Sequence, residues 1–204
     1  MGVNARSSCL STNAVEGMRV TIRRGSLDGL LIIENEPNND ERGFFLETAR
    51  MDELEAAVGE PISFVQINHS HSHRGVLRGL HAENWEKLVY VPHGEVLTAV
   101  ADVRPGSPTF GQVETFRLGE QNRRMLYIPR RMAHGWYAIS DEADYIYQVT
   151  RYYDGTDNLA VAWDDPDLAV PWPSREPVLS TKDQNNPRLR DLFPDLVSTA
   201  SRPV

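Results

Sequence analysis

The sequence predicts an all-β protein, a jelly-roll sandwich or barrel in one domain. Short segments rich in Val, Ile, Tyr and Phe alternate with Gly, Pro, Asn and Asp along most of the chain, as is typical of strands separated by turns. The turn signals recur about every 8–12 residues, without long helical periodicity between them. The 204 residues, 40% of them hydrophobic, suffice for one substantial core but hardly for two.

The expected elements follow the chain in order. A flexible lead at residues 1–17 precedes a single domain at 18–204, whose polar C-terminal part is expected to wrap the body. One helix is expected in MDELEAAVG, where Asp52 can cap the start and Gly59 can end the helix. The expected strands are residues 18–25, 30–40, 43–50, 62–70, 87–94, 95–106, 112–119, 124–131, 133–141, 144–153 and 159–163.

Composition excludes several classes of partner. The chain has 21 basic and 29 acidic residues, a net charge of −8, whereas sequence-independent nucleic-acid binding needs a basic face. No apolar run approaches the roughly 20 residues that a membrane-spanning helix requires. Cys9 is the only cysteine, so no intrachain disulfide can form. We therefore expect a cytoplasmic protein that binds neither nucleic acid nor membrane.

The segment QINHSHSHRGVLRGLHAE contains four histidines. Alternation along a strand places His69, His71 and His73 on one face. Metal-binding cupins, which share the jelly-roll architecture, have a glutamate a few residues after a His-x-His pair, but here Arg74 follows and the next acid is Glu83. An arginine opposes a divalent cation. No metal is therefore expected, and the histidines at the strand end are expected to be solvated.

Several motifs occur in the order found in one enzyme family. They are DERGFFLETAR, QINHSHSHRGVLRGLH, EKLVYVPHG, YIPRRMAHGWYAISDEADYIYQVTRYY, AWDDPDLAVPWP and VLSTKDQ. Together they resemble the nucleotide-sugar epimerases typified by dTDP-4-dehydrorhamnose 3,5-epimerase, over about residues 18–192. The resemblance implies an isomerase of deoxysugar biosynthesis that needs no cofactor or metal. Its substrate would be a nucleoside-diphosphate 4-keto-6-deoxy sugar, inverted at carbon 3, carbon 5 or both.

The resemblance assigns four residues to the chemistry. His81 in RGLH matches the base that removes the proton beside the ketone, a task suited to an imidazole. Asp165 in WDDP matches the carboxylate that orients this histidine. Tyr147 matches the proton donor on the opposite face, and Lys87 matches the lysine that holds the sugar and the developing enolate. Tyr145 is expected on the same strand face as Tyr147.

Other residues match substrate-binding positions of the family. These are Arg42, Phe45, Glu47, Gln66, Asn68, Arg78 and His134. The two arginines suit the pyrophosphate, because a planar guanidinium pairs well with phosphate oxygens, and Phe44 or Phe45 would stack on the base. Members of this family are homodimers, so Arg42 and Glu47 are expected to serve the neighbouring subunit's site.

Departures from the family pattern leave the substrate open. The loop HAENWEK is shorter than usual, and Glu83 stands where a glutamine is common. These changes leave open the nucleotide, the sugar (hexose or heptose) and the number of carbons inverted. Three other functions stay compatible with the sequence. They are a non-catalytic nucleotide-sugar-binding protein, a metal-dependent cupin enzyme that uses the histidines at 69–73, and a 3,4-ketoisomerase.

Overall fold

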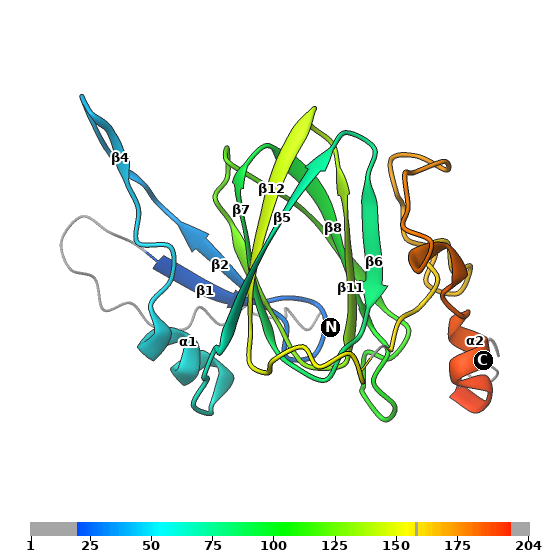
Figure 1. Cartoon of the computed structure of the whole chain (residues 1–204). Coiled ribbons are helices and arrows are strands. Elements are labelled where there is room, and N and C mark those ends of the chain that lie inside the picture. The colour runs from blue at the N-terminus through cyan, green and yellow to red at the C-terminus, as the bar shows by residue number, and fades with distance from the viewer. Residues whose placement is uncertain (1–19, 158, 197–204) are drawn as a thin grey trace, which may run out of the picture.

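The computed structural model describes residues 20–157 and 159–196, so the expected lead at 1–17 lies outside the described part of the chain. Within these residues the chain forms twelve strands and three short helical segments (Figure 1). The prediction of an all-β fold is confirmed. No helix in the described residues is long and apolar enough to cross a membrane.

Ten of the strands form two antiparallel sheets that face each other (Figure 1). The larger sheet has, in spatial order, β1 (Val20–Arg24), β2 (Leu31–Asn35), β10 (Met125–Ile128), β7 (Lys87–His93), β12 (Glu142–Val149) and β5 (Gln66–His73). The smaller sheet has β6 (Leu77–His81), β11 (Met132–Ala138), β8 (Glu95–Asp102) and β9 (Val113–Gly119). This sandwich leaves β5 at one edge of the larger sheet.

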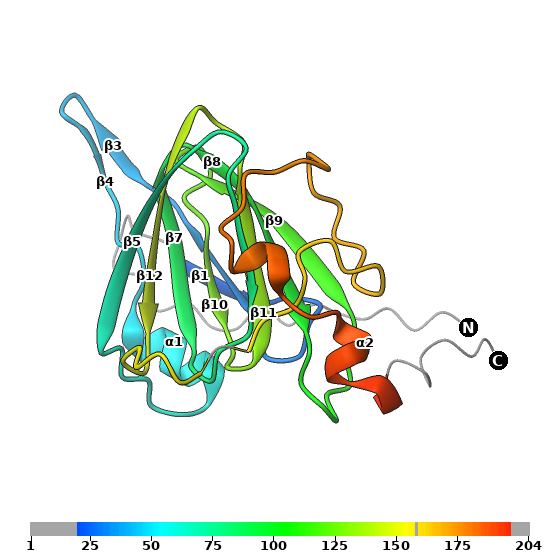
Figure 2. The same ribbon diagram turned by 45° about the vertical axis from the view of Figure 1, so that its right-hand side comes forward.

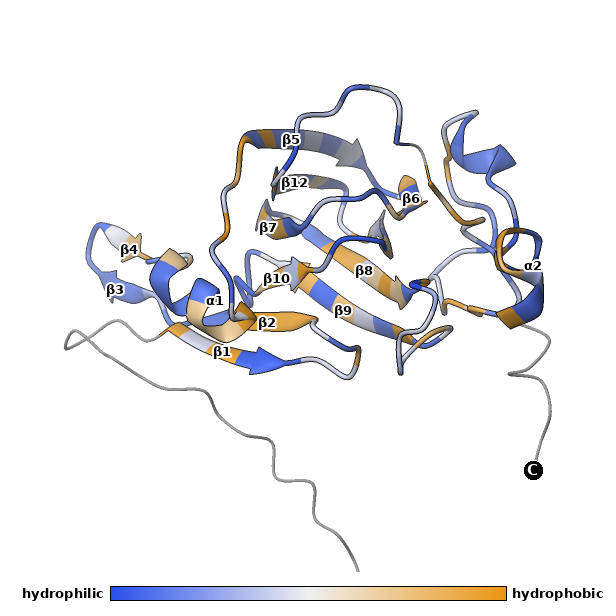
Figure 3. Cartoon of the chain, turned by 90° about the horizontal axis from the view of Figure 1, so that it is seen from below, coloured by the Kyte–Doolittle hydropathy of each residue, from blue (hydrophilic) through white to orange (hydrophobic). Residues whose placement is uncertain are grey.

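Buried hydrophobic side chains form three clusters. The main core lies between the sheets, where Ile32 and Val89 of the larger sheet share a cluster with Val100 and Leu118 of the smaller one. A second cluster lies where the C-terminal segment covers the smaller sheet, and a third lies under the helix α1 (Figure 2). Figure 3 shows the resulting pattern, with hydrophobic residues on β2 and hydrophilic ones on β3.

The helix α1 (Met51–Val58) covers one part of the larger sheet and buries Leu54. Its end is as expected, because Gly59 takes the left-handed conformation (φ 92°) and donates its N–H to Glu55. Its start is not. Asp52 lies inside the first turn, and the N-cap has no side-chain hydrogen bond, so the prediction of an Asp52 cap is wrong.

A two-stranded hairpin of β3 (Asn38–Asp40) and β4 (Gly43–Phe45) projects from the body (Figure 1). Phe44 and Phe45 are both exposed on it. Large aromatic side chains are costly to leave in water, and the hairpin contributes no residue to the three core clusters.

The C-terminal segment wraps the smaller sheet, as expected, and contains the 3₁₀ turn η1 (Asp183–Asn185) and the helix α2 (Leu189–Leu192) (Figure 2). The expected strand at 159–163 is reduced to one bridge, between His81 and Ala160. Even so, its backbone extends the edge of β6, because Leu80 and Val161 exchange hydrogen bonds of 3.2 and 2.9 Å. This contact holds the C-terminal segment beside the end of β6.

Candidate active site

A cavity of about 590 Å³ is lined by residues of both sheets and of the C-terminal segment. Its volume lies within the range of about 300–1,000 Å³ that small-molecule sites occupy. Seven of the residues expected in the site line this one cavity: Gln66, Asn68, Arg78, His81, Lys87, His134 and Tyr147. The fold thus brings together residues from β5, β6, β7, β11 and β12.

His81 is the last residue of β6, and its partner comes from η1. His81 Nε2 lies 2.7 Å from Oδ1 of Asp183, whose side chain is only 5% exposed. Burial opposes ionisation of Asp183, but the hydrogen bond and charge of His81, together with hydrogen bonds from Ser180 and the Gly79 backbone, outweigh it and hold the pKa of this carboxyl below its usual range. Because a carboxylate only accepts, Nε2 carries the proton and Nδ1 of the neutral ring is left to accept another.

Asp165 has a different role from the one expected. Its Oδ1 accepts the backbone N–H groups of Asp167 (2.9 Å) and Leu168 (3.0 Å), and its Oδ2 accepts that of Leu189 at 2.7 Å. Both oxygens are therefore occupied by the backbone of the C-terminal segment. The predicted pairing of His81 with Asp165 is wrong, because Asp183 makes that contact. Asp183 lies within VLSTKDQ, a string that carries the family resemblance but was given no role in the prediction.

Two glycines let β6 and β11 approach closely enough to place histidines side by side. A Cβ on Gly79, whose φ is +132°, would lie 2.5 Å from Cα of Gly135, and a Cβ on Gly135 would lie 2.7 Å from the Arg78 carbonyl oxygen. Real Cβ atoms do not tolerate such contacts. The close pairing puts His134 directly opposite His81 in the register of the two strands.

His134 is held in a buried aromatic wall. Its Nε2 lies 2.8 Å from the hydroxyl of Tyr145, which is fully buried and stacks on Trp136 with ring centroids 4.7 Å apart. Burial, and then the charges of Lys87 and His81, hold the pKa of His134 well below its usual value. His134 is therefore a neutral hydrogen-bonding residue of the cavity wall at physiological pH.

Tyr147 lies beside this wall and faces the cavity. Its ring centroid is 6.4 Å from that of Tyr145, so the two tyrosines share a strand face as expected. Burial raises the pKa of Tyr147, and the negative charge of Glu83 raises it further, while Arg78 acts in the opposite direction. The phenol therefore stays protonated at neutral pH and is able to donate a hydrogen bond or a proton.

Lys87 is almost fully buried in the cavity wall, at 5% exposure, and forms an ion pair there. Its Nζ donates to Oε2 of Glu83 at 2.7 Å and to the carbonyl oxygen of His81 at 3.2 Å. Burial opposes the ionisation of Glu83, but the charge and hydrogen bond of Lys87, together with the charge of His81 and a backbone hydrogen bond, outweigh it and lower the pKa of this carboxyl. The departure at Glu83 thus contributes a charged residue to the cavity. Lys182, next to Asp183, lines the same cavity. Neither Glu83 nor Lys182 was predicted as a residue of the site.

Gln66, Asn68 and Arg78 form the wall on the β5 side. Gln66 Nε2 donates to Asn68 Oδ1 at 2.7 Å, and its Oε1 accepts the N–H of Tyr153 at 3.1 Å. Arg78 Nε donates to Ser72 Oγ at 3.2 Å, and the guanidinium lies 5.7 Å from the Trp136 ring. These contacts orient a guanidinium and two amides at the cavity before any ligand arrives.

The remaining expected residues lie away from this cavity. Arg42, at 85% side-chain exposure, pairs with Asp40 on the projecting hairpin, and Phe45 is exposed on β4. Glu47 forms an ion pair with Arg50, whose Nη1 lies 3.6 Å from Glu47 Oε1. None of the three lines the cavity of its own chain among the described residues, so the service of Arg42 and Glu47 to a neighbouring subunit and the stacking of Phe45 on the base stay predictions.

Comparisons with known proteins identify sequences and structures similar to this chain. Residues 24–191 match the family described as dTDP-4-dehydrorhamnose 3,5-epimerase. A Pseudomonas aeruginosa protein of that name is 40% identical over 172 residues, which cover 82% of this chain and 95% of the relative. The crystal structure of NovW, a 4-keto-6-deoxy sugar epimerase from Streptomyces spheroides, has a TM-score of 0.84 and 35% identity, with 91% of this chain and 96% of NovW covered. RmlC from Legionella pneumophila, solved with dTDP-4-keto-L-rhamnose, has a TM-score of 0.81 and 40% identity, with 87% and 97% covered.

Proposed function

The chain belongs to the dTDP-4-dehydrorhamnose 3,5-epimerase family, and we propose that it inverts carbons 3 and 5 of a dTDP-linked 4-keto-6-deoxy sugar. The observation that carries this proposal is the His81–Asp183 pair in a cavity that also exposes the phenol of Tyr147. A base, its orienting acid and a separate proton donor are the groups that inversion beside a ketone requires.

The proton transfers assign a role to each group. Nδ1 of His81 takes the proton from the carbon beside the ketone, and the C–H electron pair moves into the enolate. Asp183 stabilises the imidazolium that forms. The Tyr147 O–H gives a proton to the opposite face of the same carbon. The His81 imidazolium then releases its proton to solvent, and the Tyr147 phenolate takes one up, so both side chains return to their starting state. Lys87 supplies positive charge near the enolate oxygen, in a site where burial strengthens electrostatic interactions.

Recognition of the nucleotide sugar is assigned to the polar wall and to a second subunit. Arg78 and Lys182 place positive charge at the cavity for the pyrophosphate. We propose a homodimer in which Arg42, Phe45 and Glu47 of the projecting hairpin complete the partner's cavity. Two exposed phenylalanines on this hairpin support a role in contact with another molecule.

Solvent exchange tests the proposed function. The protein would be incubated in heavy water with dTDP-4-keto-6-deoxyglucose, and deuterium entry at carbons 3 and 5 would be followed by NMR. We expect exchange at both carbons. His81→Asn should slow it by about 10²–10⁴-fold, the usual contribution of a general base. His93→Asn is the matched control, because this exposed histidine is paired with Glu120 and does not line the cavity.

A second variant separates proton removal from inversion. Tyr147→Phe keeps His81 and should retain exchange on the His81 face while product formation falls by about 10²-fold or more. Tight binding of the nucleotide sugar by wild type without any exchange would instead identify a non-catalytic binding protein. Exchange at carbon 3 alone would restrict the reaction to that carbon, and a moved carbonyl in the product would identify a ketoisomerase.

A further inference from the structure

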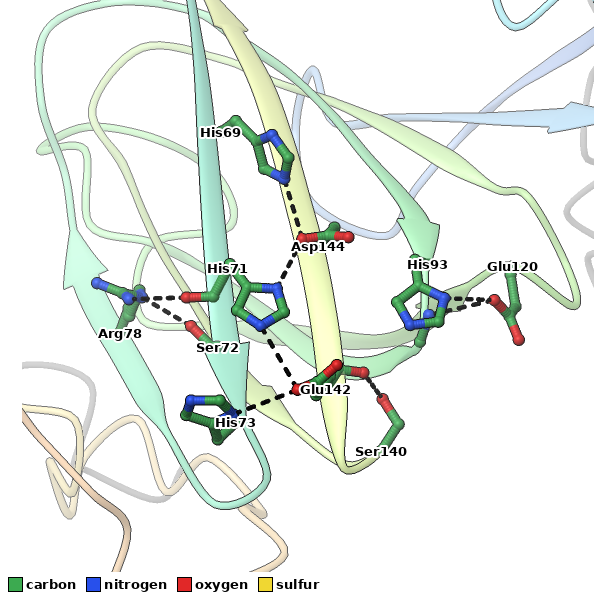
Figure 4. A network of polar contacts seen from close by, with 11 residues as sticks. His69, His71, Ser72, His73, Arg78, His93, Glu120, Ser140, Glu142 and Asp144 are labelled. Atoms are coloured by element: carbon green, nitrogen blue, oxygen red, sulfur yellow. Dashed lines mark hydrogen bonds and ion pairs between the residues drawn. The ribbon is translucent and has the colours of Figure 1, made fainter.

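The outward face of the β5–β12 strand pair carries a cluster of histidines and carboxylates that the proposed epimerase chemistry does not use. His69, His71 and His73 all point out of the sandwich, as the alternation along β5 predicts. The adjacent strand β12 places Asp144 opposite His71 and Glu142 opposite His73 in the antiparallel register. Figure 4 shows the five side chains along one end of the strand pair.

Asp144 fixes the orientation of the central histidine. Its Oδ1 accepts from His71 Nδ1 at 2.9 Å and from His69 Nε2 at 3.0 Å (Figure 4). With the proton of a neutral His71 on Nδ1, the lone pair lies on Nε2. A histidine that ligates a metal usually donates its other ring N–H to a carboxylate, which fixes the tautomer and orientation of the ring.

Three ligand atoms converge next to this support. Glu142 Oε1 lies 3.9 Å from His71 Nε2 and 3.8 Å from His73 Nδ1, and the three ligand atoms lie within 4.8 Å of one another. Tetrahedral bonds of about 2.0–2.2 Å place neighbouring ligand atoms roughly 3.3–3.5 Å apart. A closure of about half an ångström is therefore needed between Glu142 and each histidine, and of at most about 1.5 Å between the two imidazole nitrogens. These side chains, 47–76% exposed, are not held by packing.

We propose that His71, His73 and Glu142 bind a divalent transition-metal ion, best fitted by Zn²⁺, with a fourth position open to water. Two imidazole nitrogens and one carboxylate oxygen suit zinc and disfavour Mg²⁺ and Ca²⁺, which prefer oxygen ligands. The sequence argued against a metal because no acid follows the histidines along β5. The structure supplies the acid from the neighbouring strand.

The ion would not take part in the chemistry of the cavity. On β5, Gln66 and Asn68 line the cavity, whereas the histidines lie on the opposite face of the strand. The ion would instead cross-link β5, an edge strand, to β12. Since an edge strand has one neighbour only, such a link would stabilise the strand that carries part of the cavity wall.

Titration calorimetry tests the site with ZnCl₂, on the full chain without an affinity tag and after removal of metal by a chelator. We expect one Zn²⁺ per chain and no heat from MgCl₂. His71→Ala should weaken binding by at least 100-fold. Asp144→Asn, which removes only the support of His71, should weaken it by about 10–100-fold. His93→Ala is the matched control, because His93 lies on β7 of the same sheet as β5 and β12 and forms a single histidine–carboxylate pair, with Glu120 (Figure 4).

Two further measurements separate this site from the proposed epimerase. Zn²⁺ at 100 times its dissociation constant should raise the melting temperature of wild type by about 5–10 °C and leave His71→Ala unchanged. Turnover of His71→Ala should equal that of wild type. An absence of Zn²⁺ binding to wild type, or an equal loss of affinity in His93→Ala and His71→Ala, would overturn the proposal whatever the epimerase assay gives.

Discussion

Asp165 and Asp183 are two buried aspartates of the same C-terminal segment, and their carboxylates have different partners. Asp165 accepts three backbone N–H groups and fixes the path of the chain into α2. Asp183 accepts from the imidazole of His81 at the cavity. The comparison teaches that burial alone does not identify a functional acid. The partners of the carboxylate oxygens identify it, because those of Asp165 accept from the backbone and that of Asp183 accepts from the proposed base.

The largest expected effect is that of Asp183→Asn on turnover. An amide is close in shape to the carboxylate but does not stabilise the imidazolium of His81, so kcat/KM should fall by about 10²–10⁴-fold. Steady-state kinetics with the dTDP-linked 4-keto sugar measures the loss. Asp165→Asn is the matched variant, and it should keep its turnover per folded molecule. The comparison fails if the two substitutions reduce turnover equally while both proteins stay folded.

Asp165→Ala should instead lower stability. Removal of the carboxylate leaves three backbone N–H groups without their acceptor, and each orphaned buried donor costs about 1–3 kcal/mol. We expect the free energy of unfolding to fall by about 3 kcal/mol or more, and the melting temperature by about 6–12 °C. Urea denaturation followed by circular dichroism measures this change. A full loss of turnover at unchanged stability would return Asp165 to the role that the sequence suggested.

The different predictability of these two residues has a physical reason. Alternation and turn signals depend on neighbouring residues, so most of the strands and the outward face of His69, His71 and His73 were predicted from the sequence. The strand β6, which carries His81, was not among the expected strands. Contacts between distant segments depend on how the chain wraps. The pairing of His81 with Asp183, and the arrival of Glu142 from β12, are set by tertiary structure that no local pattern specifies.

The same reason explains the smaller errors. The expected cap at Asp52 is wrong because the helix begins two residues earlier than a cap at Asp52 would require, with Arg50 at the N-cap position. The expected strand at 159–163 has the right composition, but it follows β6 only through an irregular edge contact. Cavity residues such as Lys87 and Tyr147 were found because the family motifs place them, and local chemistry alone did not distinguish Tyr147 from Tyr145.

The contribution of Asp183 to stability should depend on pH in the acid range. Its pKa is lowered in the folded protein despite burial, because His81 stabilises the charged form. The stabilisation is therefore complete above the unfolded-state value of about 3.9 and is lost as the pH falls through the lower folded-state pKa. Below pH 5, the difference in unfolding free energy between wild type and Asp183→Asn should shrink, with most of the change below about pH 4. Urea titrations from pH 5 downward measure it, and a difference that grows as the pH falls over this range would contradict the assigned pairing.

The smallest effect is expected at Asp164, the residue next to Asp165. Its carboxylate forms a bidentate pair with Arg188, at 2.6 and 3.1 Å, but both side chains are more than a third exposed. Exposed ion pairs contribute about 0.2–1 kcal/mol, because water screens the attraction and two long side chains lose freedom. Asp164→Asn should therefore lower the free energy of unfolding by no more than about 1 kcal/mol, measured by urea denaturation at low and at high salt. A loss as large as that of Asp165→Ala would mean that the surface pair, and not the buried backbone contacts, holds the C-terminal segment in place.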